Sequence, residues 1–361
     1  MMWRWVAIGL IIIIGFSPIS AQNAGRIPYM VYVEHDQDQF GLDHLLFVNM
    51  HTGITTQLDV YGERYTPFGY EILYLDRQTN TVMLAHPDGT TRPHPFVQMP
   101  TDAYRIDWVI SQNAEMVAWT VTWRDQLGQL ATITYVANAD GRNLREVLRE
   151  IDLANENLRA LPIRFSDDLG TLYLDKHPDG IDPYLFFRQY VAVYALDLID
   201  NTIQALPEEF GNCICGAAIG NRQFLRLRLA PDFSGFDLYL YDLNTNNRIT
   251  FPPLRLNGYN TGGDILMSPD GKLAVYALAK VTPRPNQDPL TETVFVLVDF
   301  EAETQTVLTT PVQTFIRPIT WTEDNSAIVF TSPRDNGTWK VVLSNGRLNR
   351  VAQTTFIGIL R

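Results

Sequence analysis

The sequence contains few of the motifs that usually identify an enzyme. It has no glycine-rich phosphate loop, no dinucleotide-binding fingerprint and no G-x-S-x-G elbow. We also expect no C-terminal hydrolase segment of the kind that follows the propeller in prolyl-oligopeptidase-like peptidases. A glycosidase needs only two carboxylates about 5 to 10 Å apart, and the 40 Asp and Glu residues leave that class open. The sequence therefore favours a non-catalytic protein and predicts neither a cofactor nor a bound metal.

Clusters of basic residues are also missing. The chain has 28 Lys and Arg against 40 Asp and Glu, and its formal net charge of -12 argues against nucleic acid as a partner. Only two cysteines are present, Cys213 and Cys215 in the stretch GNCICG. They either close a small strained disulfide or remain two thiols, and two ligands alone make a poor zinc site.

Long apolar runs occur only at the N-terminus. Trp3, Arg4 and Trp5 precede an apolar run from Val6 to Phe16, and small residues follow at Ser20 and Ala21. This order is typical of a signal peptide, and the run is short for a membrane span, which needs about 20 apolar residues. We expect a signal peptide over residues 1–21, with an uncleaved membrane anchor as the alternative. The mature chain, 22–361, would then be one exported domain, periplasmic or extracellular, with no membrane span.

Short β-type runs fill the rest of the chain. Segments such as YMVYV, DLYLYDL and VFVLVDF alternate with turn signals, and the stretch 143–161 is the only candidate helix. The strands group into a unit of four strands and two turns. The first turns recur at Gly69, Gln112, Asp168, Asn221, Asp270 and Asp324, with successive spacings of 43, 56, 53, 49 and 54 residues. Units of four strands that repeat about every 40 to 50 residues are typical of propeller blades.

The second turns number one more than the first turns. They lie at 51–53, 86–89, 138–141, 199–201, 243–247, 301–303 and 344–346. The first unit, from Tyr29 to Leu58, supplies only three strands, and the C-terminal TTFIGILR has the composition of a buried strand. We therefore predict an all-β propeller of seven four-stranded blades, with six as the alternative. In this prediction the C-terminal strand completes the first blade, closes the ring and leaves a monomer without open sheet edges.

The tetrapeptide HPDG occurs twice, at 86–89 and at 177–180. The first copy stands where other blades carry NADG or SNG, so we interpret it as a turn in which Pro, Asp and Gly each supply a turn-forming property. The second copy follows TLYLD and opens a long insertion. His177 therefore remains a candidate functional residue.

These turns carry a family resemblance. LMSPDGKLAVYALA at 266–279 resembles the repeat of TolB-like and WD-repeat-like bacterial propellers, and 320–332 and 164–175 are weaker copies. The chain departs from the TolB pattern because we count seven units where that family usually has six. The Trp that usually precedes the first turn survives only as Trp108 and Trp321. The resemblance implies the fold and suggests a scaffold component of a cell-envelope complex.

The candidate site lies on the loops that link blades or join the second strand of a blade to the third. Such loops share one face, they are long here, and long loops on a rigid scaffold commonly carry binding residues. The residues that this face would collect are His35, Asp36, Asp38, Trp123, Arg124, His177, Asp179, Asp182, Tyr184, Phe186, Phe187, Arg188 and Arg284.

Aromatic residues beside arginine are typical anchors of recognition surfaces, which predicts a protein, peptide or glycan partner. In the alternative interpretation Phe186 and Phe187 pack their loop onto its own blade. His35 and His177, with Asp36 and Asp179, are of the residue types that hold a divalent metal across the ring, but the expected distance between blades one and four argues against such a site. The main rival function is a glycan-active hydrolase or lyase with carboxylates in the central funnel.

Overall fold

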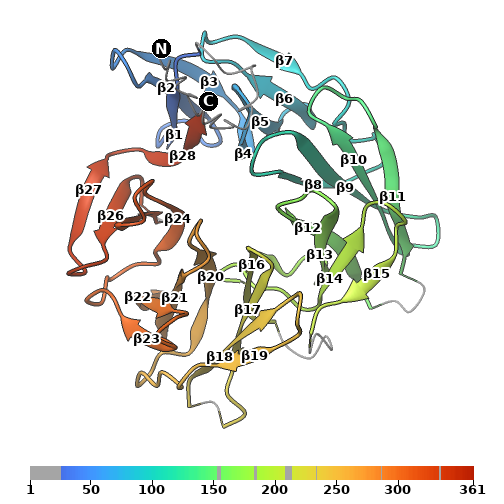
Figure 1. The fold of residues 1–361 in the computed structure, drawn as a ribbon. Coiled ribbons are helices and arrows are strands. Elements are labelled where there is room, and N and C mark those ends of the chain that lie inside the picture. Colours follow the sequence, from blue (N-terminus) through green and yellow to red (C-terminus); the bar gives the residue numbers. More distant parts are fainter. Residues whose placement is uncertain are drawn as a thin grey trace, which may run out of the picture.

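The computed structural model describes residues 26–152, 156–182, 185–207, 214–232, 234–285, 287–332 and 335–361. Its strands form seven four-stranded antiparallel sheets arranged as blades around a ring (Figure 1). The seven-bladed propeller prediction is confirmed. The predicted signal peptide, residues 1–21, lies outside the described residues. Among the described residues no helix has the length and apolar character needed to cross a membrane.

Each blade is numbered by its place along the chain, and its strands are given from the innermost outwards. Blade 1 contains β28 (Thr355–Leu360), β1 (Tyr29–His35), β2 (Asp43–Asn49) and β3 (Thr55–Val60). Blade 2 contains β4 (Gly62–Phe68), β5 (Glu71–Asp76), β6 (Thr81–Ala85) and β7 (Thr91–Pro93). Blade 3 contains β8 (Arg105–Ile110), β9 (Met116–Arg124), β10 (Leu130–Asn138) and β11 (Arg145–Ile151). Blade 4 contains β12 (Leu158–Phe165), β13 (Thr171–Pro178), β14 (Val193–Asp197) and β15 (Ile203–Ala205).

The remaining three blades follow the same order. Blade 5 contains β16 (Gly216–Gly220), β17 (Gln223–Leu229), β18 (Phe236–Asp242) and β19 (Arg248–Thr250). Blade 6 contains β20 (Thr261–Met267), β21 (Leu273–Arg284), β22 (Gln287–Asp299) and β23 (Thr304–Val307). Blade 7 contains β24 (Arg317–Trp321), β25 (Ala327–Thr331), β26 (Thr338–Val342) and β27 (Leu348–Ala352).

The C-terminal strand closes the ring as predicted. β28 pairs antiparallel with β1, with Tyr29 opposite Leu360 and Val33 opposite Thr355, and Figure 1 shows both ends of the described chain at this blade. The candidate helix at 143–161 is wrong, because the segment holds β11 and the first part of β12. Its apolar residues serve two strands of adjacent blades, where a period of two decides burial.

The core lies between the blades. Apolar clusters join each pair of neighbours from blade 1 to blade 7, and the second strands of blades 2 to 6 are buried on both faces because a blade packs on either side. The outermost strands β7 and β15 are exposed along their length. This arrangement explains why the second strands read as continuous apolar runs and the outer strands as polar ones.

The turns at one end of the ring confirm the interpretation of the first HPDG. The amide of Gly89 donates to the carbonyl of His86 at 2.9 Å, and Asp88 accepts bonds from the amide and the hydroxyl of Thr90. Gly89 has a φ of 88°, which glycine adopts without strain. In the second copy His177 and Pro178 belong to β13, so that this strand continues into the insertion.

Candidate functional site

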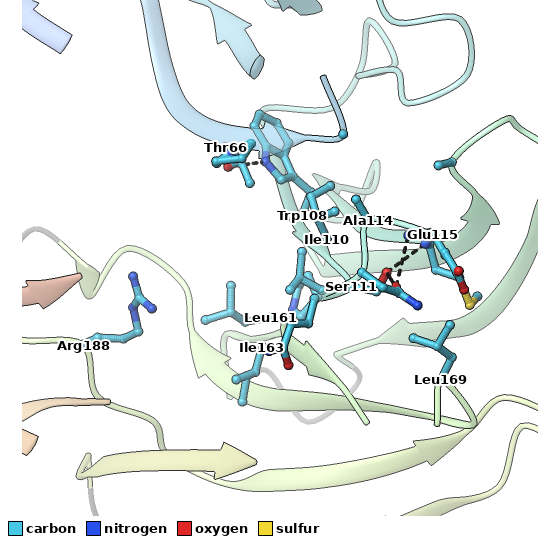
Figure 2. Close-up of a pocket in the computed structure, with 18 of the residues that line it drawn as sticks. Thr66, Trp108, Ile110, Ser111, Ala114, Glu115, Leu161, Ile163, Leu169 and Arg188 are labelled. Carbon is cyan, nitrogen blue, oxygen red and sulfur yellow. Dashed lines mark hydrogen bonds between the residues drawn. The ribbon is translucent and has the colours of Figure 1, made fainter. Parts of the chain in front are cut away.

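The seven inner strands surround a central channel, which holds two adjoining cavities of about 1400 and 1510 Å³. The two cavities share lining residues, among them Ile110, Ile163 and Arg188, so they form one continuous space. Figure 2 shows Trp108, Ile110, Leu161 and Ile163 on its wall, with Arg188 set apart from them. Each inner strand begins at the long-loop end of the ring, and the residues at these strand starts therefore form the channel mouth.

A buried carboxylate, Asp107 on β8, is the centre of the first charged group at the mouth. It accepts bonds from Arg105 at 2.8 Å and from Arg159 of β12 at 2.7 Å, and it also pairs with Arg64 of β4. Burial raises the pKa of Asp107, but the three guanidinium groups outweigh burial and lower it to about 2. This carboxylate thus stays ionised and ties blades 2, 3 and 4 together.

Arg159 extends this group to the insertion after β13. Its Nη2 lies 3.0 Å from Asp182 Oδ2, and Arg105 Nη2 lies 2.9 Å from the same oxygen. The ring of His177 bridges Asp182 at 2.9 Å and Asp175 at 2.8 Å. Burial lowers the pKa of His177, yet the hydrogen bonds to these two carboxylates raise it above its ordinary value of 6.5. Burial alone would raise the pKa of Asp182, but His177, Arg105 and Arg159 hold it well below its usual range.

Asp179 completes this group at the rim. Its Oδ2 accepts a bond from the Tyr104 hydroxyl at 2.7 Å and lies 3.1 Å from Nη2 of Arg124. Four residues of the predicted site, Arg124, His177, Asp179 and Asp182, thus meet in one network. We call this set, with Arg64, Arg105, Asp107, Arg159 and Asp175, the mouth network.

The predicted residues of blade 1 form a separate cluster. Nδ1 of His35 lies 2.6 Å from Asp43, which also accepts a bond from Tyr65. Asp36 accepts bonds from the amides of Asp38 and Gln39 and so shapes its own loop. Because His35 and His177 contact different carboxylates, they do not share a metal site across the ring. Over the described ranges no three His, Cys, Asp or Glu side chains are grouped as metal ligands would be.

The remaining predicted residues are scattered. Trp123 is half-buried against the core of blades 2 and 3, and Arg284 is exposed beside a smaller cavity. Tyr184 and Cys213 lie outside the described residues, while Cys215 is in a disulfide.

Phe187 is wrong as an exposed anchor, because its side chain is 1% exposed and packs against Phe315. Phe187 is a packing residue, as in the alternative interpretation, but it packs onto the core of blades 6 and 7 and not onto its own blade 4. Phe186 is exposed and stacks on Phe315 with ring centroids 4.8 Å apart.

Sequence reasoning missed the arginines and Asp107 of the inner strands. A signal was present, since RIDWVI, LRALPIRF and RPITW each place a charge near the start of an otherwise apolar strand. Asp264 and Arg317, also missed, form a second charged group at the mouth, with Nε of Arg317 3.1 Å from Asp264 Oδ2.

Comparisons with known proteins support the fold and do not identify a function. No family model and no curated protein match the chain. Among solved structures it is similar to an oligogalacturonate lyase in complex with manganese, with 12% identity, a TM-score of 0.55 and coverage of 87% of this chain and 83% of the lyase. It is also similar to a puromycin hydrolase, with 12% identity, a TM-score of 0.57 and coverage of 94% of this chain and 56% of the hydrolase.

TolB from Acinetobacter baumannii matches with 13% identity and a TM-score of 0.42, over 80% of this chain and 64% of TolB. The seven blades themselves show that the chain is a β-propeller, and the WD-repeat-like part of the resemblance stays a prediction.

Proposed function

We propose that the protein is an exported binding module that recognises a protein or peptide partner through its long-loop face. The observation that carries this proposal is the exposure of large apolar side chains at the tips of its long loops. Phe40, between β1 and β2, is fully exposed, and Leu127, between β9 and β10, is 84% exposed. Phe186, in the insertion after β13, and Leu290, near the start of β22, add exposed apolar surface on the same face. Exposed apolar side chains of this size are typical of the core of protein interfaces.

The mouth network gives this face the rigidity that a recognition surface needs. Its ion pairs join residues of blades 2, 3 and 4 that are far apart in the sequence, such as Arg159 and Asp107. A preorganised surface loses less conformational entropy when a partner binds. The loop after β9, which carries Leu127 and begins next to Arg124 of this network, can therefore present its tip in a fixed position.

Binding is favoured over carboxylate catalysis by the state of the acids at the mouth. A glycosidase needs one carboxyl group with a raised pKa as its proton donor. Asp107 and Asp182 are both paired with arginine, which lowers their pKa values.

Export is supported by two features of the chain. The N-terminal order of a charged segment, an apolar run and small residues is typical of a signal peptide. Cys215 is disulfide-bonded, which is common in oxidising compartments. We propose a periplasmic or extracellular location.

The test is capture of a partner from bacterial envelope extracts by the chain from Gln22 onward, tagged at its N-terminus so that β28 stays free to close the ring. The double variant F40S/L127S removes the two exposed tips of the long-loop face. Its matched control is I54S/I199S, because Ile54 and Ile199 are 68% and 90% exposed on turns at the opposite end of the ring.

We expect the wild type and I54S/I199S to capture the same protein and F40S/L127S to lose it. Equal capture by all three proteins, or loss only in I54S/I199S, would overturn the proposal. A thermal melt of each variant checks that the substitutions leave the fold intact.

A further inference from the structure

The insertion between β13 and β14 carries a chain segment from blade 4 to blades 6 and 7. We call its described part, Leu185–Ala192, the strap. Phe187 of the strap is buried among the side chains of blades 6 and 7, and the carbonyl of Phe186 accepts a bond from Arg317 at 2.6 Å. The strap then returns past blade 5, where Tyr190 pairs with Cys215. The strap thus fixes a segment of blade 4 at the far side of the channel mouth.

One glycine of β20, Gly263, allows this close contact. A Cβ atom at Gly263 would lie 2.8 Å from the carbonyl oxygen of Arg188 and 2.8 Å from Cβ of Phe187, which no side chain tolerates. The next residue, Asp264, has a φ of 50° and accepts a bond from the backbone amide of Arg188 at 2.9 Å. The contact is therefore specific, and it sets the position from which Arg188 projects.

Where the strap crosses the channel mouth, positive charges outnumber negative ones. Arg188 and Arg317 line both cavities, and Asp264 is the carboxylate that lies with them. Asp264 already accepts the Arg188 amide on one oxygen, and its other oxygen lies 3.1 Å from Arg317. The guanidinium of Arg188 bonds to the hydroxyl of Tyr190, whose pKa burial raises, so that partner is neutral at pH 7.

Among the described residues, none of the other acids that line the two cavities forms an ion pair with Arg188 or Arg317. Asp182, at the start of the insertion, is bonded to Arg105, Arg159 and His177. Five further acids line the first or second cavity and belong to blades 1, 3 and 7 and their loops: Glu34, Asp36, Glu115, Asp140 and Asp335. Two guanidinium groups thus face one carboxylate in a chain whose formal net charge is -12.

Below this charged pair the channel wall carries apolar side chains beside polar ones such as Gln112 and Ser268. Six of the seven inner strands each contribute one isoleucine to the cavity lining: Ile110, Ile163, Ile219, Ile265, Ile319 and Ile357. Ile319 lies at a β-bulge of β24, two residues after Arg317, and lines the same cavity. A ligand that fits both features has one negative charge at the mouth and an apolar portion below it.

We propose that Arg188 and Arg317 form a binding site for a carboxylate carried on an apolar stem. The planar guanidinium group matches the geometry of a carboxylate and binds it through paired hydrogen bonds. One excess positive charge suits a monoanion better than a phosphate, which brings about 1.5 to 2 negative charges at pH 7. This inference deepens the proposed function and rests on it, because it names the chemistry that the channel mouth would recognise in a partner.

The test measures binding of octanoate by calorimetry to the mature chain, with octanamide as the uncharged twin. We expect octanoate to bind and octanamide to bind at least about tenfold more weakly, since a charged hydrogen-bonded pair is lost. R188Q should weaken octanoate by a similar factor and still fold, because its guanidinium bonds only to a tyrosine hydroxyl among the described groups. R142Q is the matched control, because Arg142 also lines the channel but has a 78% exposed side chain at the short-turn end.

Three results would overturn the carboxylate site: no octanoate binding by the wild type, equal binding of octanoate and octanamide, or equal effects of R188Q and R142Q. The partner capture by F40S/L127S is measured separately, so a failure here with capture still dependent on those tips would leave the proposed function standing. Competition identifies the source of the carboxylate. If octanoate displaces the captured partner, the partner supplies the acidic group, and if it does not, the site takes a free amphiphilic acid.

Discussion

The two ends of the ring are built by different kinds of contact. At the short-turn end the aspartates of three first turns accept hydrogen bonds within their own turns: Asp270 accepts bonds from the hydroxyl of Ser268 and the amide of Lys272. The same arrangement recurs at Asp168 and Asp324. At the long-loop end Asp107 pairs with Arg64 and Arg159, which are 43 and 52 residues away in the sequence. The short-turn end is therefore local and repetitive, whereas the long-loop end depends on the closed ring and differs from blade to blade.

The largest difference between the ends should appear when a central carboxylate is removed. D107N leaves Arg64, Arg105 and Arg159 without their shared partner, and breaking a buried ion pair costs about 3–5 kcal/mol. We expect the free energy of unfolding to fall by this amount in denaturant titrations at pH 7. A fall of less than about 1 kcal/mol, as for a surface ion pair, would mean that the mouth network does not hold blades 2, 3 and 4 together.

The pH dependence of the long-loop end should follow His177. Its pKa lies above 6.5 in the folded protein because Asp175 and Asp182 outweigh burial and the nearby charge of Arg159. The stability that it contributes is therefore complete below pH 6.5 and is lost as the pH rises through the folded pKa. We expect the wild type to lose more stability than H177Q between pH 6 and pH 9, as measured by denaturant unfolding. Parallel pH profiles for the two proteins would contradict this assignment.

His94 should change the stability with pH in the opposite direction to His177, and it serves as an internal reference. Burial lowers its pKa to about 4, and its Nδ1 accepts the amide of Val97 at 2.9 Å. Its contribution is present above pH 6.5 and is lost as the pH falls toward 4, which amounts to about 3 kcal/mol. H94Q should lack this acid-side loss and keep the alkaline loss that we assign to His177.

The smallest effect should come from the short-turn end. D270N keeps one acceptor oxygen in a solvent-exposed turn, so we expect a loss of about 1 kcal/mol or less. A denaturant titration beside that of D107N checks the contrast. Equal losses for the two variants would remove the distinction between the ends.

The same contrast explains what could be predicted from the sequence. The blade count and the turns were predictable because turn residues such as Asp270 and Gly89 form hydrogen bonds with residues only two or three positions away in the sequence. Ring closure was predictable because an unpaired apolar strand at one terminus matched a missing strand at the other. The mouth network could be predicted only in part: the long loops pointed to His177, Asp179 and Asp182, but the pairing of Asp107 with Arg159 depends on how neighbouring blades are packed. The prediction of Phe187 as an exposed anchor failed because nothing in the sequence of the insertion indicates that this segment reaches blades 6 and 7.

The measurement that tests binding at the long-loop face most directly is amide hydrogen exchange of the chain, free and in complex with the captured partner. We predict slower exchange on binding in segments 36–42 and 125–129, which carry Phe40 and Leu127, with no change in the turns at 51–54 and 199–202. Protection of those turns with unchanged exchange in the long loops would contradict the account.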